Sequence, residues 1–113
     1  MPYLKIQTNQ TIDADRANTL LAEASRLVAA ELGKPESYVM VAIEPPLPML
    51  FAGKADPLAY LELKSIGLPE AKTTALSQAL CNLMETVGIS KQRVYIEFAD
   101  AERAMWGWNG ATF

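Results

Sequence analysis

The sequence contains no histidine and a single cysteine, Cys81. Without histidine, the chain cannot form Ser-His or Cys-His nucleophile pairs, histidine general bases or the common zinc ligand sets. With one cysteine it can form neither an internal disulfide nor a CxxC redox pair. Any catalysis must therefore use carboxylates, lysine, tyrosine, the lone thiol or a chain terminus.

Basic residues and long hydrophobic runs are also scarce. The net charge is −3 and no Lys/Arg-rich run occurs, which argues against nucleic acid as a partner. The apolar stretches are interrupted by Glu, Lys or Pro well before the roughly 18 residues that a membrane span needs. No charged segment followed by an apolar one opens the chain, so we expect no signal peptide and a cytoplasmic location by default. Secretion by a route without a signal peptide stays open.

Hydrophobic residues make up 50% of the 113 residues, which is enough for one domain with one core. Two segments show the three- and four-residue spacing of a helix with one buried face. The first runs from Asp13 as N-cap to Gly33 as C-cap, and the second is opened by Pro69-Glu70 and closed by Gly88. Their apolar faces consist of Leu20, Leu21, Ala24, Leu27, Val28 and Leu32, and of Leu76, Ala79, Leu80, Leu83, Met84 and Val87.

Four segments rich in β-branched and aromatic residues predict strands. They are YLKIQ from Tyr3, YVMVAI from Tyr38, LAYLELK from Leu58 and VYIEF from Val94. Each helix lies between two of them, and the closing glycines are 55 residues apart (88 minus 33). We therefore predict an internal repeat over residues 2–45 and 58–99 within a single domain of residues 1–113 that ends in a segment over 104–113.

The predicted fold is α+β, with two β-α-β units that form one four-stranded sheet and both helices on one face. Several positions on the other face are apolar, so we expect an oligomer to cover it. EPPLPMLFAGKADP, rich in proline, is predicted to be the loop that joins the halves. In WGWNGATF the Asn109-Gly110 pair predicts a short hairpin that packs on a neighbouring subunit.

Pro2 directly follows the initiator Met1. Methionine aminopeptidase removes Met when the next side chain is small, so the mature chain is expected to begin with a free secondary amine on Pro2. The alternative is that proline is merely tolerated at a chain start, because it has no N–H that needs a partner.

Six segments resemble the macrophage migration inhibitory factor family, in the same order and spacing: MPYLKIQTN, GKPESYVMV, MLFAGKADP, LKSIGLP, ISKQRVYIEF and WGWNGATF. The resemblance implies a homotrimer and a keto-enol tautomerase of the superfamily that includes the oxalocrotonate tautomerases. It implies no cofactor, and phenylpyruvate, hydroxyphenylpyruvate and a dopachrome ester as assay substrates. Some animal members are extracellular signals, so the alternative is a binding or signalling trimer without relevant catalysis, whose receptor cannot be inferred.

The resemblance also implies roles for residues around the start of the chain. Pro2 would be the catalytic base, because an α-amino group has a pKa near 8 that burial and a nearby cation lower. Lys34 would bind the substrate carboxylate and lower the pKa of Pro2; otherwise it only complements the dipole of the preceding helix. The backbone N–H of Ile66 would be a second anchor, with Ser65 as a weaker neighbour.

Aromatic residues would complete the pocket. Tyr95 would reach it from the adjacent subunit, unless it is only a strand tyrosine packed among other aromatic rings. An apolar rim for an aryl group would consist of Tyr38, Met105, Trp106 and Trp108. Trp106 in particular could equally well serve packing alone.

Two features depart from the family. Leu58 and Leu61 replace the CxxC pair of the cytokine members, so thiol-disulfide activity should be absent, and Cys81 is predicted to belong to the core. Glu97 stands where the animal members have a substrate-binding asparagine. A carboxylate about 6 Å from an anionic substrate would cost on the order of 3 kcal/mol at a dielectric constant of about 20. Glu97 could instead pair with Lys34 or select a less acidic substrate.

The Glu97 carboxylate predicts weak turnover of aryl 2-keto acids and an alkaline pH optimum, because it favours the protonated form of Pro2. Glu97→Asn should therefore raise kcat/KM for phenylpyruvate and lower the pH optimum, both measured by enolisation assay over a pH series. An unchanged kcat/KM and pH profile would remove Glu97 from this account.

Overall fold

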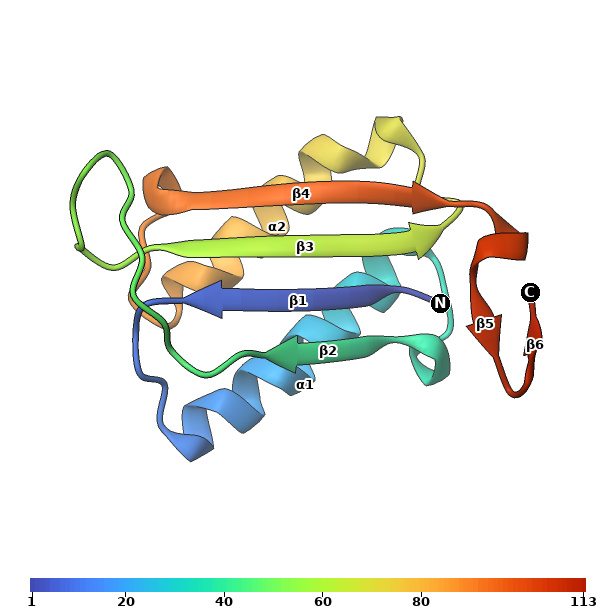
Figure 1. The fold of residues 1–113 in the computed structure, drawn as a ribbon, viewed down its shortest axis with the longest axis horizontal. Coiled ribbons are helices and arrows are strands. Elements are labelled where there is room, and N and C mark those ends of the chain that lie inside the picture. The colour runs from blue at the N-terminus through green and yellow to red at the C-terminus, as the bar shows by residue number, and fades with distance from the viewer.

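The computed structural model describes all residues 1–113, which form a four-stranded sheet with two helices on one face (Figure 1). The elements are β1 (Tyr3–Thr8), α1 (Ala14–Leu32), β2 (Met40–Ile43), β3 (Ala59–Ile66), α2 (Thr73–Glu85), β4 (Val94–Ala101), β5 (Gly107–Trp108) and β6 (Ala111–Thr112). Short 3-10 helices cover Glu36–Tyr38, Glu70–Lys72, Lys91–Arg93 and Arg103–Met105. Neither α1 nor α2 has the length and apolar character that a membrane crossing requires.

The strand order in the sheet is β2-β1-β3-β4. β1 pairs with β2 and β3 pairs with β4 in parallel, each pair being connected through one helix, whereas β1 and β3 are antiparallel. The predicted α+β fold with two β-α-β units and both helices on one side is confirmed. The antiparallel pairing of Leu4 with Leu63 lies at the centre, where the two units join.

The core lies between the sheet and the helices. Alternate residues of the strands point into it, and α1 and α2 each contribute one apolar stripe, as their spacing predicts. The side chains that are at most 2% exposed include Leu4, Ile6, Leu61 and Leu63 of the sheet and Leu20, Ala24, Val28, Leu76, Leu80 and Met84 of the helices. The polar Thr8 is buried with them and donates its hydroxyl to the backbone oxygen of Leu58 at 2.7 Å.

Capping residues limit both helices. The Asp13 carboxylate accepts from the N–H of Arg16 at 2.9 Å, and Gly33 has a φ of 62°, so both predicted caps of α1 are confirmed. α2 is shorter than predicted, because a 3-10 turn precedes Thr73 and the regular helix ends at Glu85. Gly88, with a φ of 82°, then closes a tight turn.

The second strand begins later than predicted. Glu36–Tyr38 forms a 3-10 turn after Pro35, closed by the Val39 N–H, which donates to the Glu36 oxygen at 3.0 Å. β2 therefore starts at Met40, and Tyr38 lies outside the sheet. Proline fixes the entry to this turn, and it outweighs the strand preference of Tyr38 and Val39.

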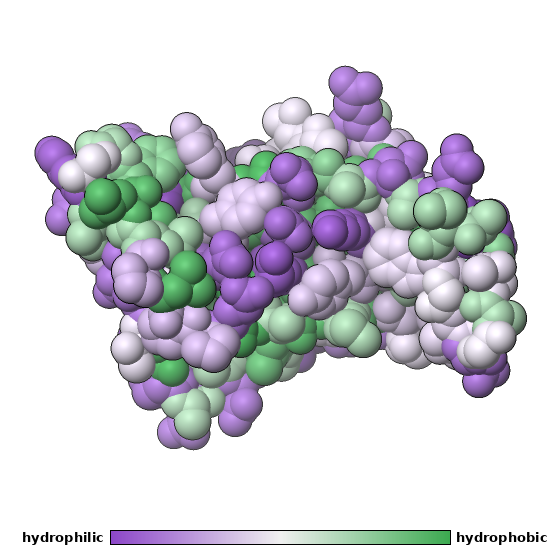
Figure 2. All heavy atoms as spheres, viewed as in Figure 1, coloured by the Kyte–Doolittle hydropathy of each residue, from purple (hydrophilic) through white to green (hydrophobic).

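The uncovered face of the sheet is polar at its centre, contrary to the expectation of an apolar face. Figure 2 shows hydrophilic side chains across its middle and hydrophobic ones toward its ends. Lys5 Nζ lies 3.3 Å from Glu62, and Lys64 Nζ lies 3.8 Å from the same carboxylate. Burial favours a higher pKa for Glu62, but hydrogen bonds from Lys5 and Tyr60 and the two lysine charges outweigh it and lower that pKa.

Candidate active site

The start of β1 is held at one end of the sheet. The Met40 N–H donates to the Pro2 oxygen at 2.9 Å, and the Met1 amine donates to the Tyr38 oxygen at 2.7 Å. The Pro2 side chain is fully buried. In Figure 1 this end of the sheet faces the β5–β6 hairpin, so the two chain ends lie near each other.

Lys34 brings a positive charge to the same place. It follows Gly33 at the end of α1, and its Nζ lies 3.8 Å from the position that a Cβ on Gly67 would occupy, next to Ile66. Lys34 forms no ion pair within the chain. Burial, followed by the charge of Lys34, lowers the pKa of the Met1 amine. This end of the sheet thus combines the Met1 amine, whose pKa is lowered, with the unpaired cation of Lys34.

The turn after β3 is fixed by two hydrogen bonds. The Asp100 carboxylate accepts from the N–H of Leu68 at 3.0 Å, and the Ser65 hydroxyl donates to the oxygen of Ile66 at 3.0 Å. Ser65 is fully buried, so its hydroxyl supports the turn from the core side. Asp100 is not apparent from the sequence, because its role depends on the pairing of β3 with β4.

Three aromatic rings pack together beside this turn. The centroid of Tyr38 lies 5.7 Å from Trp108 and 6.0 Å from Phe113, and Trp108 stacks on Phe113 at 5.6 Å. The predicted Asn109-Gly110 turn is confirmed, with φ values of 53° and 77°. It returns Phe113 to Trp106, whose oxygen accepts the Phe113 N–H at 3.2 Å.

The other two residues predicted for the rim, Met105 and Trp106, differ in exposure. Met105 is 80% exposed just before β5, and Trp106 is half-buried. Phe113, which the sequence places in the same hairpin, was not predicted to belong to the pocket, although the turn in WGWNGATF could have placed it beside Trp108.

Tyr95 and Glu97 lie far from Pro2 of their own chain. Across the sheet, Tyr95 lies opposite Tyr60, which lies opposite Gln7, five residues after Pro2. Glu97 lies opposite Glu62, which lies opposite Lys5, three residues after Pro2. At about 3.3 Å per residue and about 4.8 Å per strand, Tyr95 is about 19 Å and Glu97 about 14 Å from Pro2. Glu97 also forms no ion pair with Lys34 in the chain. Only a second copy could bring these side chains to the Pro2 end.

Comparisons with known proteins cover the whole chain. The family model described as macrophage migration inhibitory factor (MIF) matches residues 1–113. This chain belongs to the MIF family. The resemblance noted in the sequence is thereby confirmed over its whole length, and the family includes tautomerases.

Individual relatives match over nearly all of their length. The chain is 39% identical to a macrophage migration inhibitory factor homolog of Brugia malayi, over 100% of this chain and 99% of that protein. The crystal structure of a homologue from Prochlorococcus marinus is 43% identical with a TM-score of 0.93, covering 98% of both chains. The structure of Pt0534 inactivated by 2-oxo-3-pentynoate is 28% identical with a TM-score of 0.85, covering 97% of this chain and 94% of that one.

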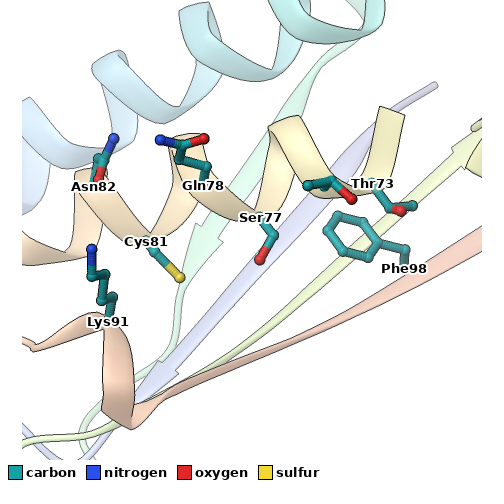
Figure 3. A pocket seen from close by; sticks show the side chains of 8 residues that line it. Thr73, Ser77, Gln78, Cys81, Asn82, Lys91 and Phe98 are labelled. Carbon is teal, nitrogen blue, oxygen red and sulfur yellow. The ribbon is translucent and has the colours of Figure 1, made fainter. Parts of the chain in front are cut away.

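Cys81 lies apart from the Pro2 end that this MIF-family chain presents. It lines a groove of about 600 Å³ beside α2 and β4, together with Ser77, Lys91 and Phe98 (Figure 3). Burial raises the pKa of the Cys81 thiol, which is half-buried against the core. A thiol in this state is a poor nucleophile. The groove contains none of the residues predicted for the site.

Lys34 should contribute to the lowered pKa of the N-terminal amine. Lys34→Gln removes a cation that disfavours the ammonium form, so the pKa should rise. The measurement is the pH dependence of N-terminal modification by an amine-directed reagent, located by peptide mass. Lys91→Gln removes the same charge from the groove beside α2 and should leave the midpoint unchanged. Equal midpoints for wild type and Lys34→Gln would contradict this assignment.

Proposed function

We propose that this chain is a cofactor-free keto-enol tautomerase that acts as a homotrimer, with residues 1–113 as one tautomerase domain. Its substrates would be phenylpyruvate-type aryl 2-keto acids and dopachrome-like compounds. The observation that carries the proposal is the buried Pro2 beside the unpaired Lys34 cation, under a cluster of aromatic rings.

The base in this proposal is the nitrogen of Pro2 after removal of Met1. While Met1 is present, that nitrogen belongs to an amide and has no basic lone pair. Burial and Lys34 already lower the pKa of the Met1 amine, one residue away. The Pro2 side chain is more completely buried than Met1, so an amine on Pro2 would be desolvated further. Both effects favour the unprotonated form that a general base requires.

In the proposed reaction the Pro2 nitrogen takes a proton from the carbon beside the keto group. The electron pair of that C–H bond forms the C=C bond, and the carbonyl π electrons move to the oxygen, which takes a proton from water to give the enol. The protonated Pro2 then gives its proton to the hydroxide that this water leaves, which restores the base. The Lys34 ammonium and the Ile66 N–H would stabilise the substrate carboxylate and the developing oxyanion. The rings of Tyr38 and Trp108 would hold the aryl group.

Relatives of this chain support the choice of substrate class. Pt0534 is inactivated by 2-oxo-3-pentynoate, which is a 2-keto acid with a conjugated alkyne. Such an alkyne accepts an attacking nucleophile, so the compound suits a site that binds 2-keto acids next to a reactive group. The Lys34 cation offers this chain the matching partner for the acid carboxylate.

Assembly of several copies, as the homotrimer requires, is supported by where large apolar side chains are exposed. Met40, Met105 and Trp108, near the Pro2 end, are 65%, 80% and 55% exposed, and Leu50 and Tyr95, near the opposite end, are 69% and 67% exposed. Burial of these ends against other copies would remove apolar surface from water and bring Tyr95 toward a neighbouring Pro2. Glu97, two residues farther along β4, would approach the same neighbouring site.

A second candidate is a binding or signalling trimer whose pocket turns over no relevant substrate. One observation favours it: the Met1 amine is anchored to the Tyr38 oxygen at 2.7 Å, and a chain that retains Met1 carries no free amine on Pro2. Direct enolisation of phenylpyruvate by a sample of known N-terminal mass separates the two candidates.

Pro2→Gly should lower kcat for phenylpyruvate enolisation, because the glycine amine left after removal of Met1 lacks the ring that fixes the direction of the lone pair. A matched control inserts an alanine between Met1 and Pro2. That insertion keeps the proline side chain but turns its nitrogen into an amide, so it should lower kcat by about 10²- to 10⁴-fold, the usual contribution of a general base. Full activity in either variant, with the expected N-terminal mass, would refute Pro2 as the base.

A further inference from the structure

We propose that Arg93 is a positioning residue that orders the loop over residues 51–57 and thereby fixes the Tyr95 ring for the neighbouring subunit. The effect on catalysis rests on the proposed function, in which Tyr95 completes a site on another copy. The effect on the Tyr95 ring itself is independent of turnover.

The Arg93 guanidinium donates hydrogen bonds to four backbone carbonyls of one loop. Its Nε donates to the oxygen of Pro57 at 3.0 Å. Its Nη2 donates to the oxygens of Asp56 at 3.1 Å, Lys54 at 3.1 Å and Phe51 at 3.3 Å. Arg93 forms no ion pair in the chain, so its charge is balanced by these carbonyl dipoles. A lysine has no planar set of donors with which to reach the same oxygens.

The loop needs such support at its tip. Ala52 and Gly53 follow each other with φ values of 54° and 72°, and a left-handed conformation is unfavourable for alanine. The turn is closed by the Phe51 N–H, which donates to the Lys54 oxygen at 2.9 Å, and by the Lys54 N–H, which donates to the Phe51 oxygen at 3.1 Å. Arg93 donates to both of these oxygens as well, so it reinforces the turn at the two carbonyls that close it.

The Phe51 ring lies between Arg93 and Tyr95 and contacts both side chains. The Arg93 guanidinium carbon lies 5.2 Å from the centroid of the Phe51 ring, and that centroid lies 4.9 Å from the centroid of Tyr95. A cation over one ring and a second ring tilted against it both favour a fixed orientation.

Tyr95 has few other restraints within the chain. It is 67% exposed, and with residues 49–52 and 58–60 it lines an apolar hollow of about 470 Å³. Its contact with Phe51 therefore limits the rotamers that the ring would otherwise sample. Order in the free subunit lowers the entropy that must be lost when the ring joins a neighbouring site.

A double-mutant cycle tests the catalytic part of this proposal. A displacement of about 1 Å can reduce catalysis by up to about 100-fold, so Arg93→Ala should lower kcat/KM for phenylpyruvate by about tenfold. In a Tyr95→Ala background the same change should alter kcat/KM by less than about twofold. Arg93→Lys should not restore activity, and Arg26→Ala, which removes an exposed arginine from α1, should have no effect. Equal losses in both backgrounds, or full activity of Arg93→Lys, would overturn the proposal.

Fluorine NMR of fluorotyrosine-labelled protein tests the structural part without turnover. The chain has four tyrosines, and a Tyr95→Phe variant assigns the line of Tyr95. Arg93→Ala should move and narrow this line as the ring leaves Phe51. If that variant does not fold, Phe51→Leu keeps the backbone acceptors of Arg93, removes the contacting ring and must move the same line.

A Tyr95 line unmoved by these changes overturns the positioning role. If the wild-type protein has no tautomerase activity but the variants move the Tyr95 line as expected, the proposed function is refuted and the positioning role of Arg93 stands.

Discussion

The antiparallel pairing of β1 with β3 determines which ends of the two β-α-β units meet. Because these strands run in opposite directions, the start of β1 meets the end of β3, so Pro2 lies next to Ser65 and Ile66. β4 is parallel to β3 and begins at the other end of the sheet, which separates Tyr95 from Pro2. A slip of one residue would turn Leu4 and Ile6 toward solvent, so the buried core itself fixes this register.

The division of the site follows from the same pairing. One end of the sheet holds the amine, the cation and the aromatic rings, and the other holds Tyr95 on β4, against the loop that Arg93 orders. Ion pairs between lysines and Glu62 occupy the uncovered face between them, and such groups gain little by leaving water. Assembly through the apolar ends agrees with this distribution better than assembly through the middle of the sheet face.

Local chemistry made much of the fold predictable from sequence. Asp13 and Gly33 ended α1 as expected, the apolar spacing gave the buried faces of both helices, and Asn109-Gly110 gave the hairpin. The predicted strand at Tyr38 was wrong because Pro35 sets up a turn that strand propensity does not reveal. The polar residues of the uncovered face were visible in the sequence, but the apolar positions between them received too much weight.

The roles assigned to site residues came from family resemblance, whereas their physical support needed tertiary structure. Lys34 lies near Gly67, and Arg93 donates hydrogen bonds to carbonyls of residues 51–57. Both contacts join segments that are more than thirty positions apart in the sequence. No periodicity or local motif records contacts of that kind. Asp100 was overlooked for the same reason, since its contact depends on strand register, whereas the Asn109-Gly110 turn was a local signal for the place of Phe113.

The central claim is that the mature chain carries a free, reactive amine on Pro2 in a site for 2-keto acids. Incubation with 2-oxo-3-pentynoate near neutral pH, followed by intact mass and peptide mapping, tests it most directly. The account predicts one adduct per chain, on the Pro2 nitrogen, and loss of any tautomerase activity in proportion to labelling. A chain without Met1 that remained unlabelled, or that was labelled only at Cys81 or a lysine, would contradict it.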